Sequence, residues 1–182
     1  MAQQTPWAIL LCKWTDMPKE AKPRALFEQM FTASGQGSLN MVDFFGDMSH
    51  GHVDVGNSKV FGWLTLPQKW SDYKGSGANQ QGRQDLIIWA KQAAAAAGIN
   101  LSTFFNVVVC MNATSTQGAD LFGGGLGVVC DTNVLEGSVL GQEMGHAYGL
   151  DHSRKDGSTA DYRDAWDVMS TWDGCFMAPH KD

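Results

Sequence analysis

The amino-acid sequence predicts a single domain of the α+β class, and three observations support this. The chain has 182 residues, a length that suits one domain. Its hydrophobic content of 43% is enough to fill one core. Short apolar runs typical of strands and longer helical patterns both occur along the chain, with no internal repeat or linker between them. We therefore expect residues 1–182 to form one domain.

The first half of the chain predicts three strands and two helices. The apolar run ending at Cys12 indicates a buried strand, because it is too short for a signal peptide and lacks a basic leader. Ser38 is a suitable cap for a short helix. A three-residue connection, Gly56-Asn57-Ser58, is typical of a hairpin. The expected elements are a strand over residues 9–12, a helix over 18–31, a short helix after Ser38 that carries Met41, Val42, Phe45 and Met48, and strands over 51–55 and 59–66.

The second half predicts two further strands and two helices. An alanine run followed by Gly98 indicates a helix that ends at that glycine. A glycine-rich segment leads into a strand around Gly125 to Val129, which we place at an edge of the sheet. The expected elements are helices over residues 83–97 and 134–148 and strands over 104–111 and 123–130. The chain is irregular from residue 151 onward.

The most informative feature lies on the last predicted helix. Residues 142–152 read QEMGHAYGLDH. Gln142 and His146 are one helical turn apart, so both side chains can reach one metal ion. Glu143 adjoins that pair and can act as a general base on water. Gly149 can end the helix in a left-handed conformation, after which His152 can return as a third ligand.

This run resembles the zinc signature of the metzincin proteases, H-E-x-x-H-x-x-G-x-x-H, with Gln142 in place of the first histidine. The segment Asp167-Val168-Met169-Ser170 resembles their Met-turn. Residues 152–154 (HSR), 162–170 (YRDAWDVMS), 43–51 (DFFGDMSHG) and 60–67 (VFGWLTLP) resemble the gametolysin and immune-inhibitor-A-like group. Some gametolysin-type proteases carry Q-E-x-x-H at the first position.

The resemblance implies a metzincin-like architecture. An upper lobe over residues 1–149 would hold a mixed, twisted sheet with two main helices and the active-site helix beneath it. A small irregular lobe over residues 150–182 would supply the third ligand and the Met-turn. The family usually continues beyond that turn, so a downstream portion is expected. The resemblance also implies secretion to the extracellular space.

The implied function is that of a zinc-dependent endopeptidase. Gln142, His146 and His152 would bind one zinc ion, although the amide oxygen of Gln142 is a weaker donor than imidazole and leaves other divalent metals open. Glu143 would take a proton from the attacking water and pass it to the leaving amine. Tyr162 is a candidate for stabilising the oxyanion, while packing is the usual role of such a tyrosine. Met169 would form an apolar floor beneath the metal, much as a core methionine does.

Other features restrict the partners. The net charge of −6 and the lack of a basic stripe argue against nucleic acid, and no apolar run approaches a membrane span. We expect a monomer that acts on protein or peptide substrates, with the edge strand at residues 125–129 either pairing with the substrate or serving as a plain flexible loop.

His50 and His52 would share one face of a strand, as a second metal site or, better, as a surface pair.

The four cysteines give only a weak indication of the cellular compartment in which the protein resides. Cys12 and Cys110 lie in apolar runs where a buried thiol is the default. Cys130 and Cys175 flank the metal motif and are the better candidates for a disulfide bond.

Two alternatives to an active protease remain. The chain is then either a catalytically inactive relative that keeps the fold as a binding module, or a variant inactivated by a deliberate His-to-Gln change. The retained Glu143 argues against a long-standing loss of activity, because an inactive site has no need of a general base.

Overall fold

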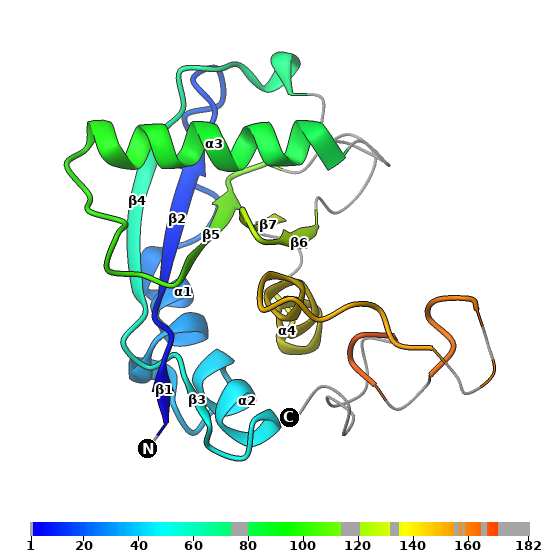
Figure 1. The fold of residues 1–182 in the computed structure, drawn as a ribbon. Coiled ribbons are helices and arrows are strands. Elements are labelled where there is room, and N and C mark those ends of the chain that lie inside the picture. The colour runs from blue at the N-terminus through cyan, green and yellow to red at the C-terminus, as the bar shows by residue number, and fades with distance from the viewer. Residues whose placement is uncertain are drawn as a thin grey trace.

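The computed structural model describes residues 2–73, 80–113, 121–131, 135–154, 157, 159–164 and 167–170. It confirms the α+β class. A five-stranded sheet has the order β4-β2-β5-β7-β6, in which all strands are parallel except the edge strand β6 (Figure 1). A second, two-stranded sheet pairs β1 with β3. The strands are β1 (Gln3–Gln4), β2 (Trp7–Lys13), β3 (Val53–Asp54), β4 (Lys59–Thr65), β5 (Asn106–Met111), β6 (Phe122–Gly124) and β7 (Gly127–Asp131).

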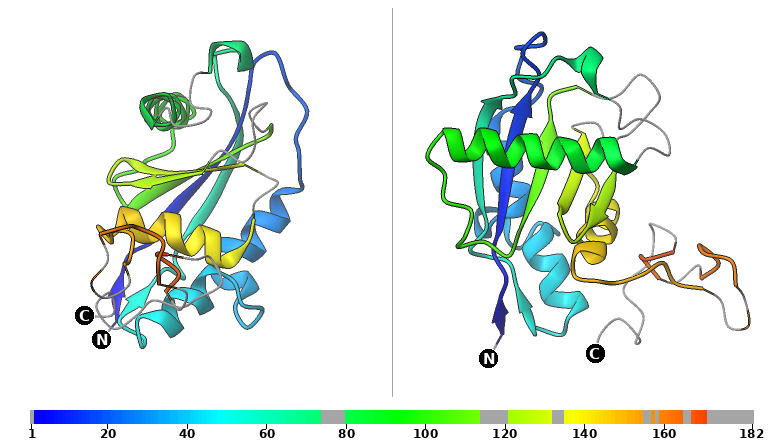
Figure 2. Two further views of the ribbon diagram at one scale, coloured as in Figure 1. Left: turned by 90° about the vertical axis from the view of Figure 1, so that its right-hand side faces the viewer. Right: turned by 45° about the horizontal axis from the view of Figure 1, so that its top comes forward.

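Helices cover both faces of the large sheet. α3 packs on one face, and α1, α2 and α4 lie on the other (Figure 2). The strands at the centre are therefore buried on both sides, which explains why β2 is an unbroken apolar run. Along β2, Ile9 and Leu11 face α1, α2 and α4, while Ala8 and Leu10 face α3. The helices are α1 (Arg24–Phe31), α2 (Met41–Met48), α3 (Gln80–Ala96) and α4 (Gly137–Ala147), with short 3-10 turns at Ala33–Gly35 and Trp70–Asp72.

Two helix starts differ from the prediction. α1 begins at Arg24, whereas we expected a helix from residue 18, because Pro23 lacks a backbone N–H and can only precede the helix. α2 is capped by Asn40, whose side chain accepts hydrogen bonds from the backbone of Val42 and Asp43. We had expected Ser38 to provide this cap. Asn40 is also buried, so the cap is enclosed in the structure.

The predicted hairpin of residues 51–66 is wrong. β3 pairs with β1, and β4 pairs with β2, both in parallel. A short connection allows a hairpin but does not require one, and the turn at residues 56–58 instead carries the chain from the small sheet to the large one. The predicted edge strand is also misplaced. β7 lies between β5 and β6, so among the described strands β6 forms that edge.

The cysteines pack differently from the expected pairing. Cys12 and Cys110 are fully buried, as expected, but so is Cys130, which is a free cysteine. β5 and β7 are parallel neighbours with Cys110 opposite Cys130, and their Sγ atoms are 3.2 Å apart. The expected Cys130–Cys175 bond is therefore absent, because Cys130 points into the core; Cys175 lies outside the described residues.

In the part of the chain that the structure describes, no helix has the length and apolar character needed to span a membrane.

Candidate metal centre

α4 carries Gln142 and His146, with His146 in its last turn. The helix ends as the sequence predicts. Gly149 has a φ of 92°, in the left-handed region that favours glycine. The backbone N–H of Leu150 donates to the carbonyl of Gly145 and closes the helix end. The chain then reverses direction, which brings His152 back toward His146.

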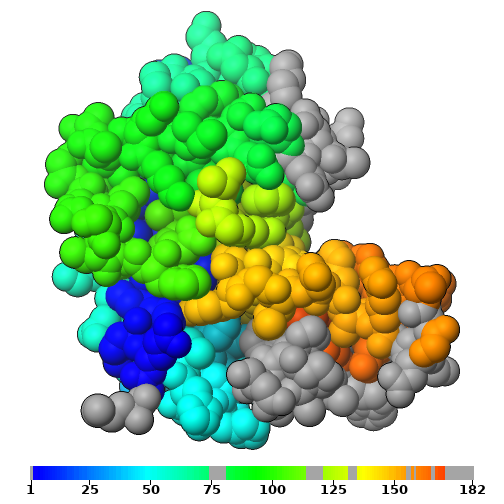
Figure 3. All heavy atoms as spheres, viewed as in Figure 1, coloured from blue at the N-terminus to red at the C-terminus, as the bar shows by residue number. Residues whose placement is uncertain are grey.

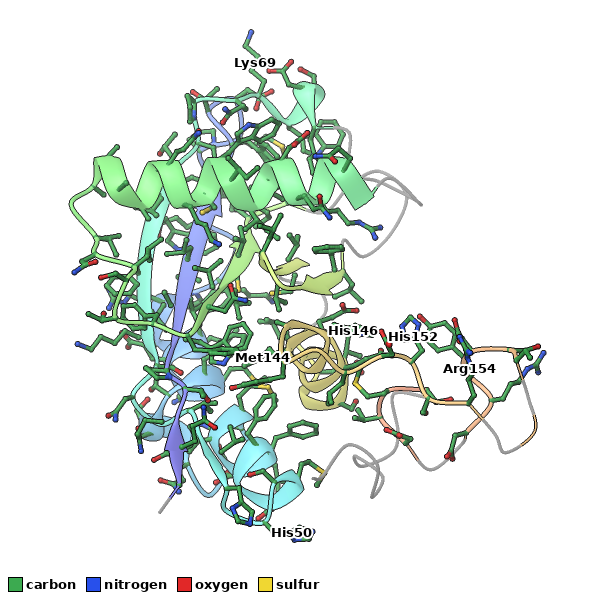
Figure 4. All side chains as sticks on the ribbon, viewed as in Figure 1. His50, Lys69, Met144, His146, His152 and Arg154 are labelled. Atoms are coloured by element: carbon green, nitrogen blue, oxygen red, sulfur yellow. The ribbon has the colours of Figure 1, made fainter. Side chains whose placement is uncertain are left out.

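The side chains of His146 and His152 meet at their outer nitrogen atoms. The two Nε2 atoms are 3.1 Å apart, and the rings are almost perpendicular, with centroids 4.6 Å apart at 84° (Figure 4). The Nδ1 atom of His146 lies 2.8 Å from the carbonyl oxygen of Leu150. A carbonyl can only accept a hydrogen bond, so Nδ1 carries the proton and Nε2 keeps its lone pair.

This spacing fits two ligands of one metal ion. Zinc–nitrogen bonds of about 2.0–2.1 Å in a tetrahedral site place two nitrogen ligands about 3.3 Å apart. The 3.1 Å between the Nε2 atoms is close to that value. Burial lowers the pKa of His152, the neighbouring His146 lowers it further, and the carboxylates of Asp161 and Asp151 oppose this effect. The result favours the neutral imidazole, which is the form that binds metal.

Gln142 contributes a buried amide one turn before His146. Only 2% of its surface is exposed, and its Nε2 atom makes no hydrogen bond within the described residues. A buried polar group without a partner costs about 1–3 kcal/mol. In the same ranges, no three His, Cys, Asp or Glu side chains gather into a metal site. Gln142 lies one helical turn before His146, so the two residues share one face of α4.

Glu143 has a carboxylate whose pKa lies near neutral pH. Burial raises its pKa to about 7, and the charge of the Arg83 guanidinium partly offsets that rise. A base works best when its pKa lies near the operating pH, so Glu143 is suited to accept and return a proton. Arg83, at the start of α3, was not foreseen as part of this site. No local motif joins it to Glu143, because only the fold brings α3 and α4 within electrostatic range.

β6 lies directly against α4 at the position of Glu143. A Cβ atom placed on Gly123 would lie 2.0 Å from the backbone carbonyl oxygen of Glu143, so only glycine fits there. Two residues earlier on the helix, a Cβ atom on Gly141 would collide with the ring of Phe44 at 2.3 Å. These two glycines allow α4 to lie close to both the sheet edge and α2.

Tyr162 contacts His152. Its hydroxyl lies 2.5 Å from Nε2 of His152, and the two ring centroids are 4.1 Å apart. The residue has a φ of 59°, an uncommon conformation for a side chain other than glycine. Burial raises the pKa of Tyr162, and the carboxylates of Glu143 and Asp161 raise it further. The structure thus brings Tyr162 to His152 and within electrostatic range of Glu143.

A pocket of about 420 Å³ opens beside His152, lined by Asp151, His152, Arg154 and Asp161. The Nε atom of Arg154 donates to Asp161 at 2.6 Å. Asp161 Oδ2 lies 3.9 Å from Nδ1 of His152, the ring nitrogen that does not face His146. Nothing in the sequence indicated that Arg154 would lie in this pocket.

Met169 lies in a tight turn over residues 167–170. Its backbone N–H donates to Oδ1 of Asp167, and the N–H of Ser170 donates to the Asp167 carbonyl. Met169 is fully buried in the same apolar cluster as Met144 of α4. The N–H of Ser153 donates to the Met169 carbonyl at 3.2 Å, which ties the turn to the residue after His152.

The remaining predicted positions lie elsewhere. His50 and His52 are exposed and belong to the turn before β3, not to a strand, and Figure 4 shows His50 well away from His146 and His152. Their place on the surface fits the expected surface pair. Trp166, Trp172 and His180 lie outside the described residues.

No known protein family model matches this chain, and no curated protein matches it either.

Proposed function

We propose that this chain is a metal-dependent endopeptidase of the metzincin type. The observation that carries the proposal is the pair of Nε2 atoms on His146 and His152, which face each other at 3.1 Å beside a carboxylate with a pKa of about 7. The sequence resemblance supports zinc as the metal, with another divalent ion as the alternative, and supports an extracellular monomer.

His146, His152 and Gln142 would hold the ion. A divalent metal ion bound there lowers the pKa of water and polarises the carbonyl of the scissile peptide. Glu143 holds the attacking water, accepts its proton and returns that proton to the leaving amine nitrogen. Arg83 limits the rise in the pKa of Glu143, so that the carboxylate is available as a base around neutral pH.

β6 gives an extended substrate a place to bind. It is the outermost strand among those described on this side of the sheet, and its antiparallel pairing with β7 leaves the opposite side facing away from the sheet. A peptide that adds to this edge would run past α4 at Glu143, because Gly123 holds β6 against that part of the helix. The expected substrate is therefore an extended segment of a protein.

Digestion of casein or gelatin by the purified chain tests this function. We expect cleavage that a chelator abolishes and that added zinc or another divalent ion restores. Glu143→Gln is the matched control, because it keeps the shape of the side chain and removes the base. We expect that variant to lose at least about 100-fold in rate while it keeps its bound metal. A chain that binds metal but cleaves no protein would instead favour a binding module.

A further inference from the structure

We propose that Cys110 and Cys130 form a disulfide bond between β5 and β7 when the chain folds under oxidising conditions. This bond would lie in the sheet and not among the proposed metal ligands, so it does not depend on the proposed function. It would take the place of the bond between Cys130 and Cys175 that we expected from the sequence.

The pairing of two parallel strands places the cysteines opposite each other. Cys110 is the register partner of Cys130, and both side chains belong to the apolar cluster on the face of the sheet that α4 covers. Neighbouring strands lie about 4.7–4.9 Å apart. The Cα atoms of bonded cysteines are usually about 4.4–6.8 Å apart. The backbone of β5 and β7 therefore has the spacing that a disulfide bond needs.

The two sulfur atoms lie closer to each other than ordinary packing requires. Their separation is 3.2 Å, which is shorter than the usual contact distance of two sulfur atoms that are not bonded. A disulfide bond is about 2.05 Å long, so the atoms need to approach by roughly 1 Å. Both side chains are fully buried, so the finished bond would be enclosed in the core and shielded from reducing agents.

Cys12 provides a contrast within the same sheet. It lies on β2 and faces α3, on the opposite side of the sheet from Cys110 and Cys130. Burial raises the pKa of the Cys12 thiol to about 12, so in the folded chain it stays protonated and unreactive. Among the three cysteines that the structure describes, only Cys110 and Cys130 are placed to bond to each other.

The bond would form by exchange with a small disulfide such as oxidised glutathione. The thiolate of one cysteine attacks a glutathione sulfur, breaks its S–S bond and releases one glutathione thiolate. The thiolate of the other cysteine then attacks the protein sulfur of the mixed disulfide and releases the second. The two cysteines lose two electrons, and the two released glutathiones take up the two protons. Exchange takes place while β5 and β7 come together, because both sulfur atoms are inaccessible afterwards.

The bond would anchor the part of the sheet that lies beside α4. β7 contacts α4 and pairs with β6 on its other side. A bond from β7 to β5 links residues that are 20 positions apart in the sequence, which restricts the unfolded chain. We expect the oxidised chain to unfold at a temperature about 5–10 °C above that of the reduced chain.

Peptide mapping tests the bond directly. The full chain is refolded with reduced and oxidised glutathione, denatured in iodoacetamide and digested without a reductant. We expect one linked pair of peptides that contains Cys110 and Cys130, lighter by two hydrogen atoms than the separate peptides, while Cys12 is alkylated. Alkylation of both Cys110 and Cys130, or a bond from either one to Cys175, overturns the proposal.

Thermal unfolding after refolding with glutathione or with a phosphine reductant separates the bond from simple packing. The parent and Cys12→Ala should each unfold about 5–10 °C lower when reduced. The double variant Cys110→Ala/Cys130→Ala should unfold at one temperature in both conditions. If the double variant does not fold, the parent and Cys12→Ala still give the result. A parent that unfolds at the same temperature in both conditions overturns the anchoring role, whatever the outcome of the casein assay.

Discussion

At the level of single residues, Gln142 would set how strongly the proposed metal centre binds its ion. It stands where the metzincin signature has a histidine, and it is almost fully buried. Its amide nitrogen has no hydrogen-bond partner among the described residues. A metal ion would bind the amide oxygen and not this nitrogen, and it would bind that oxygen less strongly than it binds an imidazole.

Gln142→His should therefore tighten zinc binding by about tenfold or more, because nitrogen is the better donor to this ion. We expect hydrolysis to change little or to fall, since the parent is an adapted enzyme in this account. Zinc competition assays and casein digestion of both proteins check the two halves of this prediction. A parent that is silent at saturating zinc, beside a vigorous variant, would mean that Gln142 is an inactivating change.

Glu143 makes the stability of the metal-free protein depend on pH. Its pKa is about 7 in the folded chain against 4.5 in the reference state. The folded state then binds the proton more tightly, so the contribution of Glu143 to stability is complete below pH 4.5 and is lost as the pH rises through 7. The pKa difference corresponds to on the order of 3 kcal/mol.

Urea unfolding in the presence of a chelator, at a series of pH values, measures this effect. Glu143→Gln carries no charge in either state, so the free energy of unfolding of the parent minus that of the variant should fall between pH 4.5 and 7. A difference that stays constant across this interval would show that Glu143 is not held in a desolvated position.

At the level of secondary-structure elements, the contact between β6 and α4 fixes the position of the helix that carries the proposed site. Gly123 allows this contact because no Cβ atom fits against the carbonyl of Glu143. Gly125, in the turn after β6, has open space around its Cα. The two glycines are two residues apart and differ mainly in this contact, so they form a matched pair for substitution.

Gly123→Ala should destabilise the fold by roughly 1–3 kcal/mol, because the added methyl group forces β6 away from α4. It should also lower the rate of peptide hydrolysis, since both Glu143 and the edge strand move. Gly125→Ala should lie close to the parent in both respects. Chemical denaturation and the casein assay check this pair, and equal effects from the two substitutions would contradict the proposed packing.

The elements that could be predicted correctly from the sequence are those marked by a pattern within one short stretch of the chain. The apolar run of β2 and the glycine that ends α4 could be identified without neighbours in space. The partners of β3 and β4 could not, because strand pairing depends on contacts far along the chain. The same holds for Cys110 and Cys130, which become neighbours through parallel strands.

The candidate site was predictable to the same extent. Gln142, Glu143, His146 and His152 follow from spacing along one helix and one turn. Arg83 and Asp161 required the fold, because their relation to Glu143 and His152 comes from separate segments packed together. Tyr162 was named from the sequence, but its contact with His152 depends on the path of an irregular segment.

At the level of the whole molecule, side chains near the beginning of the chain contact the end of α4, the helix that carries the proposed metal ligands. The hydroxyl of Tyr148, at the end of α4, lies 2.7 Å from Oγ1 of Thr5 and receives a hydrogen bond from Nε1 of Trp7. Figure 3 shows the described part of residues 150–170 (orange) as a ledge beside α4, below the yellow-green β6 and β7. The site thus lies where the sheet edge, α4 and this ledge come together.

Titration of the metal-free chain with zinc, with bound metal and peptide hydrolysis measured in the same samples, tests the central claim most directly. Parallel titrations with Co²⁺ and Mn²⁺ cover the other divalent ions. We predict that hydrolysis rises in proportion to bound metal and reaches its maximum at one ion per chain. Hydrolysis that proceeds without bound metal, or one bound ion per chain without hydrolysis for every metal tested, would contradict the account.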